Sequence, residues 1–106
     1  MAWLALFSAG LLEIIWAFAM KQSHGFTRLW PSVITLAAML ASFALLAWAM
    51  RTLPLGTAYM IWTGIGAVGA FLLGVMLLGE SANALRLFAA LLILSGLVLM
   101  KVASPA

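Results

Sequence analysis

Polar and charged residues divide the sequence into four long apolar runs, at residues 2–20, 31–50, 55–78 and 84–101. A helix needs roughly 20 apolar residues to cross the hydrocarbon core of a bilayer, and each run approaches or exceeds that length. The four runs together nearly exhaust the chain. The pattern therefore predicts an all-α membrane protein, with four transmembrane helices in a single domain over residues 1–106.

The composition agrees with this prediction, since hydrophobic residues make up 68% of the chain and charged residues 7%. A soluble domain of this size could not cover so much apolar surface. The chain has no cysteine, which excludes disulfides and thiolate metal sites, and we expect neither a metal nor a cofactor. Its net charge of +3 comes from basic residues near the helix ends, where contact with membrane lipid explains them without any nucleic-acid partner.

The basic residues are almost evenly divided between the two sides of the predicted bundle. Lys21, Arg28 and Arg86 belong to the side with the first and third loops, whereas Arg51 and Lys101 belong to the side with the termini. The positive-inside rule then gives almost no preferred orientation. Many transporters combine two inverted repeats, and this chain is too short to contain both. We therefore expect copies to insert both ways up and to form an antiparallel, dual-topology homodimer.

Glu13 is the one charged residue inside the first apolar run. An ionisable group at mid-membrane depth costs about 2.5–3.5 kcal/mol on insertion scales, so it marks a candidate functional site. Gly10 and Trp16 share its helix face at a spacing of three. The glycine allows close approach of a ligand or helix, and the Trp16 indole could donate a hydrogen bond to the carboxylate. Ordinary helix packing is the alternative explanation of this face.

Two further polar or aromatic features lie at mid-membrane depth. Tyr59, Trp62 and Gly66 share one face of the third run, and Ser42 lies in the middle of the second. A carboxylate flanked by aromatic faces is typical of organic-cation sites, so these residues are predicted to line one. The alternatives are aromatic packing and a Ser42 hydroxyl bonded back to its own helix.

Small residues mark two other positions. Gly64 and Gly66 weaken the middle of the third helix, where we predict flexing, although packing explains them equally well. Ala89 and Gly96 lie seven residues apart on one face of the fourth helix, which suits close helix contact. We assign that face to the dimer contact.

The sequence contains no pattern typical of an enzyme, so we expect Glu13 to bind and release ligands rather than to catalyse a reaction. There is no aspartate, one histidine, His24, and no nucleophile with a base nearby. Burial favours the neutral form of a carboxyl, so Glu13 can hold a proton and release it when a cation arrives. If access alternates only when one ligand neutralises the acid, inward proton flow drives outward cation flow.

The chain resembles the small multidrug resistance transporters over nearly its full length, and among them the guanidinium exporters. The resemblance rests on Gly10, Glu13 and Trp16, on Ser42, on the loop run 25–32, and above all on the run 56–66, with weaker agreement at 79–81 and Lys101. It implies a proton-coupled antiporter of the bacterial inner membrane, with two copies of Glu13 forming one shared site. In that family the positions matching Trp16, Ser42, Tyr59 and Trp62 hold the acid or line the substrate.

Guanidinium is the substrate that the resemblance favours. Trp16 together with Thr57 and Thr63 is similar to the guanidinium-exporting branch, and a planar cation with a fork of N–H donors can pair with a carboxylate through two parallel hydrogen bonds. Two alternatives remain. One is export of quaternary ammonium or other drug cations, and the other is a non-transporting membrane adaptor that assembles through its helix faces.

Overall fold

Four helices make up the part of the chain that the computed structural model describes, residues 1–103. They are α1 (Ala2–Gln22), α2 (Leu29–Ala49), α3 (Leu55–Leu77) and α4 (Ala84–Ala103), with no strand among the described residues. All four are long and apolar enough to cross a membrane. The predicted all-α class with four spanning helices is confirmed.

The observed helix ends differ from the apolar runs by one or two residues, for local reasons. α1 continues through Lys21 and Gln22, because polar residues at a membrane interface need not leave the helix. α2 begins at Leu29, two residues before Pro31. Proline fits there, since the N–H groups of a first turn have no partner within the helix. α4 begins after Asn83, whose side-chain oxygen accepts a hydrogen bond from the Arg86 N–H at 2.9 Å and so caps the helix.

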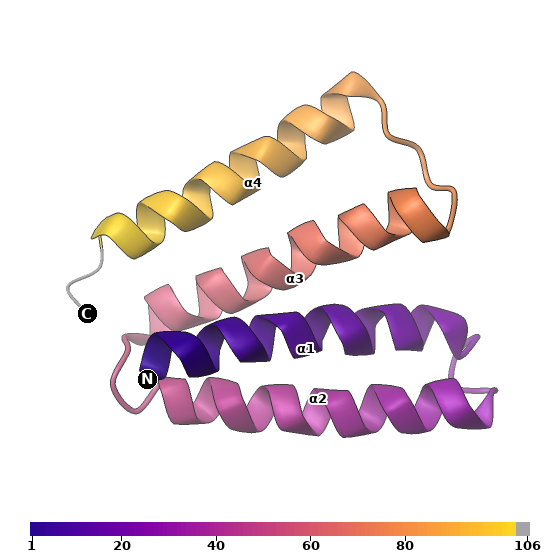
Figure 1. The fold of residues 1–106 in the computed structure, drawn as a ribbon, viewed down its shortest axis with the longest axis horizontal. Helices are drawn as coiled ribbons and strands as arrows, with labels where there is room; N and C mark the ends of the chain where they lie inside the picture. The colour runs from indigo at the N-terminus through magenta and orange to yellow at the C-terminus, as the bar shows by residue number, and fades with distance from the viewer. Residues whose placement is uncertain (104–106) are drawn as a thin grey trace.

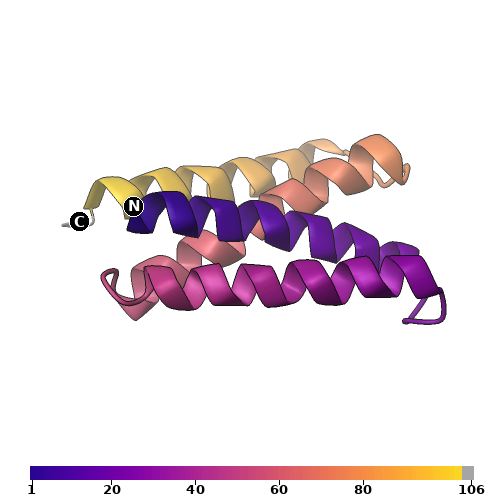
Figure 2. The same ribbon diagram turned by 60° about the horizontal axis from the view of Figure 1, so that its bottom comes forward.

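The helices form a flat, open arrangement rather than a closed bundle (Figures 1 and 2). α1 packs against both α2 and α3, and α4 packs mainly against α3, with Lys101 near its end reaching the Trp3 ring of α1. No residue of α4 is buried. The molecule measures 42 × 34 × 16 Å, so it is much thinner than it is long or wide.

The buried core lies where α1 meets α2 and α3 near one end of the molecule. It consists mainly of small and branched apolar side chains with one indole: Ala5, Leu6, Ala9, Leu46, Ala49, Leu53, Ala58, Ile61 and Trp62. The N-terminus, the α2–α3 connection and the end of α4 lie at this end, and the other two connections lie at the opposite end (Figure 1). The two groups of basic residues predicted from the sequence thus occupy opposite ends.

Glycines from the middle of α3 onward let neighbouring elements approach its backbone. A Cβ built on Gly64 would lie 2.9 Å from Cγ of Leu97 in α4, and one built on Gly74 would lie 2.6 Å from the Glu80 carboxylate. Gly66 and Gly69 likewise face Glu13 and Ile14 of α1. α3 is one continuous helix through all four glycines. Packing explains them in this structure, and flexing at Gly64 and Gly66 stays a prediction.

We expect Gly64→Ala to destabilise the protein by about 1–3 kcal/mol, because the added methyl group would collide with Leu97 and push α4 away from α3. Gly56→Ala is the matched control, since a Cβ there meets nothing within 4 Å. Both changes replace a glycine of α3 by alanine, and Gly56 lies in the first turn, where the helix-propensity gain is the smaller. A lower unfolding free energy in detergent for Gly64→Ala than for Gly56→Ala therefore reports the packing. Equal stabilities for the two variants would contradict the assignment.

Candidate functional site

Glu13 lies at the contact between α1 and α3, where its carboxyl group rests against Gly66. A Cβ built on Gly66 would lie 2.8 Å from Cγ of Glu13 and would collide with the carboxyl group itself. The glycine therefore makes the space that the acid occupies. One turn earlier on α1, a Cβ on Gly10 would lie 2.7 Å from Cγ2 of Ile65, so Gly10 serves helix contact in this protomer.

Two polar atoms of α1 are buried without a hydrogen-bond partner among the described residues. They are Oε1 of Glu13 and Nε1 of Trp16. The hydrogen bond that the sequence suggested between these two side chains is therefore not formed. A buried polar group left unpaired costs about 1–3 kcal/mol, so an arrangement with two of them is incomplete until something else supplies partners. The chain thus presents an unpaired acceptor and an unpaired donor near the middle of α1.

Ser42 connects three helices through one hydroxyl group. Its Oγ donates to the Ala9 carbonyl of α1 at 2.7 Å and accepts from the Trp62 indole N–H of α3 at 2.9 Å. The side chain is fully buried. The alternative that this hydroxyl bonds back to its own helix is wrong. Ser42 instead fixes the Trp62 ring beside α1 and α2.

The aromatic side chains form a row across the three packed helices. Trp16 contacts Phe43 edge to face at a centroid separation of 6.3 Å, Phe43 lies 5.8 Å from Trp62, and Trp62 lies 5.6 Å from Tyr59. The predicted residues Trp16, Trp62 and Tyr59 are thus brought together. The sequence did not indicate Phe43, because adjacent residues of a helix do not share a face and Ser42 therefore gives no signal for its neighbour. Phe43 and Tyr59 remain 44% and 52% exposed, so half of the row faces outward.

Two of the predicted residues lie apart from this group. Ala89 and Gly96 are exposed on α4, and a Cβ on Gly96 would meet nothing within 4 Å. Their assignment to a dimer contact stays a prediction.

The chemistry available at this site is that of a single carboxyl group beside aromatic faces. Residues 1–103 contain no group of three or more histidine, cysteine or acidic side chains that could hold a metal ion. The one salt bridge among the described residues, Arg86 with Glu80, involves the other acid of the chain, so Glu13 has no basic partner. A carboxyl group in this position can bind a proton or an organic cation.

Four spanning helices that carry one unpaired acid at mid-membrane depth define a small multi-pass membrane protein of the transporter type. The sequence profile described as Small Multidrug Resistance protein matches residues 1–93, and the chain belongs to this family. It is a multi-pass protein of the bacterial inner membrane, as the resemblance implied.

Similar proteins in three bacteria carry one name. The guanidinium exporters of Citrobacter freundii, Salmonella typhimurium and Escherichia coli strain K12 are each 58% identical to this chain over 104 residues. The match covers 98% of this chain and 99% of each relative.

We expect Ser42→Ala to lower the unfolding free energy by about 0.6–1.7 kcal/mol, from the average to the maximum for hydrogen bonds between membrane helices, because it leaves the Trp62 N–H without its acceptor. Ser95→Ala is the control, since Ser95 is exposed on α4. Chemical unfolding in mixed micelles measures both. A Ser42→Ala protein as stable as the Ser95→Ala protein would show that the three-helix connection adds no stability.

Proposed function

We propose that this protein exports guanidinium across the inner membrane in exchange for protons, and that both ligands bind in turn at Glu13. The observation that carries the proposal is the buried Glu13 oxygen, which has no hydrogen-bond partner among the described residues. A carboxyl group in apolar surroundings needs a proton or a cation to neutralise it. The names of the 58% identical relatives support guanidinium as the cation.

The shape and bonding of guanidinium suit this position. The cation is planar and presents parallel N–H donors, which pair with the two oxygens of one carboxylate. Its faces stack favourably on aromatic rings, and the row from Trp16 to Tyr59 supplies such rings near the acid. An ammonium ion of similar size is not planar, so it would lack at least one of the three features, which are planar shape, parallel N–H donors and stacking on aromatic rings.

Coupling follows from competition for one acid. A site that binds either a proton or guanidinium, and that changes access only when one of them is bound, exchanges the two ions obligatorily. The inward proton gradient then drives guanidinium outward. No other titratable side chain is required for the exchange.

The functional unit is proposed to be an antiparallel homodimer. A protomer 16 Å thick, with an unburied α4 and two unpaired polar atoms on α1, lacks one wall of the site. Three basic residues at one end against two at the other give either orientation similar weight. A second, inverted copy would place its Glu13 opposite the first and would cover α4 through Ala89 and Gly96.

Transport of quaternary ammonium ions is the second candidate function. Phe43 and Tyr59 leave about half of the aromatic row uncovered, and hydrophobic cations without N–H donors bind through such surfaces. A cation panel separates the two candidates.

In proteoliposomes on a solid-supported membrane, we expect guanidinium to evoke transport currents and tetrapropylammonium to evoke weaker ones. Glu13→Gln should abolish the guanidinium current, because the amide can neither release a proton nor pair with a cation as a carboxylate does. Glu13→Asp should keep exchange with a shifted pH dependence, since the shorter acid sits differently against Gly66. A guanidinium current in Glu13→Gln equal to that of the wild type would refute Glu13 as the exchange site. Absence of any cation current in the wild-type protein would favour the adaptor role instead.

Topology is testable because the chain has no native cysteine. We expect a single cysteine at position 52, in the exposed α2–α3 connection, to react with a membrane-impermeant maleimide in about half of the copies in intact cells. The rest should react after permeabilisation. A cysteine at position 24, at the other end, should divide in the same way. Complete labelling from one side at either position would rule out dual topology.

A further inference from the structure

A second acid lies at the end of the same helix contact that holds Glu13. The chain has two acidic residues, Glu13 and Glu80. Glu13 rests on Gly66, and Glu80 folds back onto Gly74, where a Cβ would lie 2.6 Å from its Oε1. Gly74 follows Gly66 by eight residues, or about 12 Å along the axis of α3 at 1.5 Å per residue. Both acids are therefore held against α3 by glycines, one in mid-membrane and one at its end.

The backbone holds Glu80 in this position. Gly79 has a φ of +70°, which turns the chain sharply after α3, and the Glu80 N–H donates to the Gly74 carbonyl at 3.0 Å. The carboxylate then borders a cavity of about 300 Å³ between α1, α3 and the segment that enters α4. Its lining includes Phe18, Lys21, Phe71, Gly74, Glu80 and Arg86.

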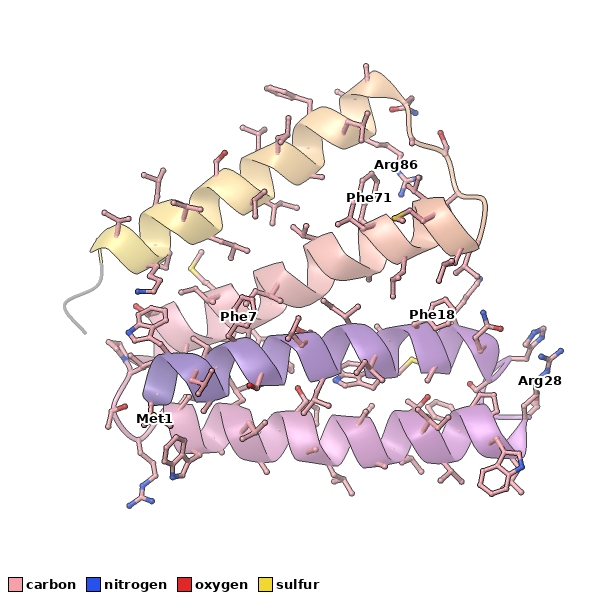
Figure 3. The ribbon with its side chains drawn as sticks, viewed as in Figure 1. Met1, Phe7, Phe18, Arg28, Phe71 and Arg86 are labelled. Atoms are coloured by element: carbon pink, nitrogen blue, oxygen red, sulfur yellow. The ribbon has the colours of Figure 1, made fainter. Side chains whose placement is uncertain are left out.

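The Arg86 side chain places a guanidinium group in this cavity. Its Nη2 lies 3.8 Å from Oε1 of Glu80, its Nη1 donates to the Ser81 carbonyl at 2.5 Å, and its Cζ lies 4.9 Å from the centre of the Phe71 ring. Figure 3 shows Arg86 beside Phe71 at this end of the molecule. A carboxylate, a carbonyl oxygen and an aromatic face are the three partners that a guanidinium ion prefers.

The arginine is held weakly enough to be replaced. Its side chain is 39% exposed and that of Glu80 is 43% exposed. Exposed pairs of this kind contribute little, so a soluble cation can displace one. Lys21 also lines the cavity, and its positive charge repels any cation bound beside Glu80, which favours rapid release of that cation. At the other end of the molecule Lys101 lies 4.4 Å from the Trp3 ring centre, but neither of the two acidic side chains lies there.

We propose that Glu80, Phe71 and the Ser81 carbonyl form a peripheral site for guanidinium-type cations, which Arg86 fills when no free cation is bound. A free guanidinium ion takes the place of the arginine head group and waits at the end of the α1–α3 contact that leads to Glu13. This inference rests on the proposed function. It assigns to Glu80 the capture of substrate, and to Arg86 the role of a tethered competitor.

The test measures initial guanidinium currents against concentration in proteoliposomes at low ionic strength. Glu80→Gln should raise KM about two- to fivefold with an unchanged maximal rate, because an exposed carboxylate is lost from capture but not from exchange. Arg86→Gln should lower KM by a similar factor, since it removes the competitor. Phe71→Leu should raise KM as Glu80→Gln does. Unfolding curves in detergent accompany each variant.

The double variant Glu80→Gln, Arg86→Gln and the control Arg28→Gln separate this site from a general surface potential. In the Glu80→Gln background, Arg86→Gln should leave KM unchanged, so the double variant should keep the raised KM of Glu80→Gln. If the two residues acted only through the surface potential, their opposite charge changes would cancel and the double variant would have the wild-type KM. Arg28 is exposed at the same end, so Arg28→Gln removes the same charge and should leave KM unchanged. Three results would overturn the peripheral site. They are a wild-type KM in the double variant alone, a changed KM in Arg28→Gln, and a wild-type KM in all variants.

The two proposals fail in different ways. Absence of a guanidinium current in the wild-type protein would refute guanidinium export itself. A normal wild-type current together with KM values that do not respond to Glu80, Phe71 or Arg86 would refute the peripheral site alone.

Discussion

The close approach of α1 and α3 is the constraint on which the other features of this protein depend. Residues that face each other across this contact pair a large side chain with a glycine: Ile65 with Gly10, Glu13 with Gly66, and Ile14 with Gly69. In hydrocarbon no hydrophobic force draws helices together, so their association relies on such close packing and on hydrogen bonds. The same packing that joins the two helices also fixes where the acid lies.

Hydrogen bonds complete the arrangement where packing alone would not specify it. The Ser42 hydroxyl satisfies the Trp62 indole and in turn bonds to α1, so every polar atom of this connection has a partner. Glu13 and Trp16 contrast with it, because each keeps one buried atom unpaired among the described residues. The Ser42 connection at Ala9 is therefore structural, whereas Glu13, one turn further along α1, is a candidate binding position.

The sequence predicted the helices and the acid, but not the partners of the polar groups. Helix number and bounds follow from run length, and Glu13 stands out because a charge in hydrocarbon is costly. Ser42 bonds to a residue 33 positions earlier, which no local pattern indicates. Phe43 looks like any lipid-facing phenylalanine in the sequence. The glycines of α3 suit bending and packing equally until the side chains opposite them are known.

The thinness of the protomer has a consequence for how such a protein can vary. In the proposed assembly both walls of the site come from one coding sequence, so each substitution appears twice, once on each side of the cation. The two entrances to the site, one on each side of the membrane, would likewise be copies of one another. A change that improves capture on the releasing side must also act on the loading side, and directionality has to come from the ion gradients rather than from the protein.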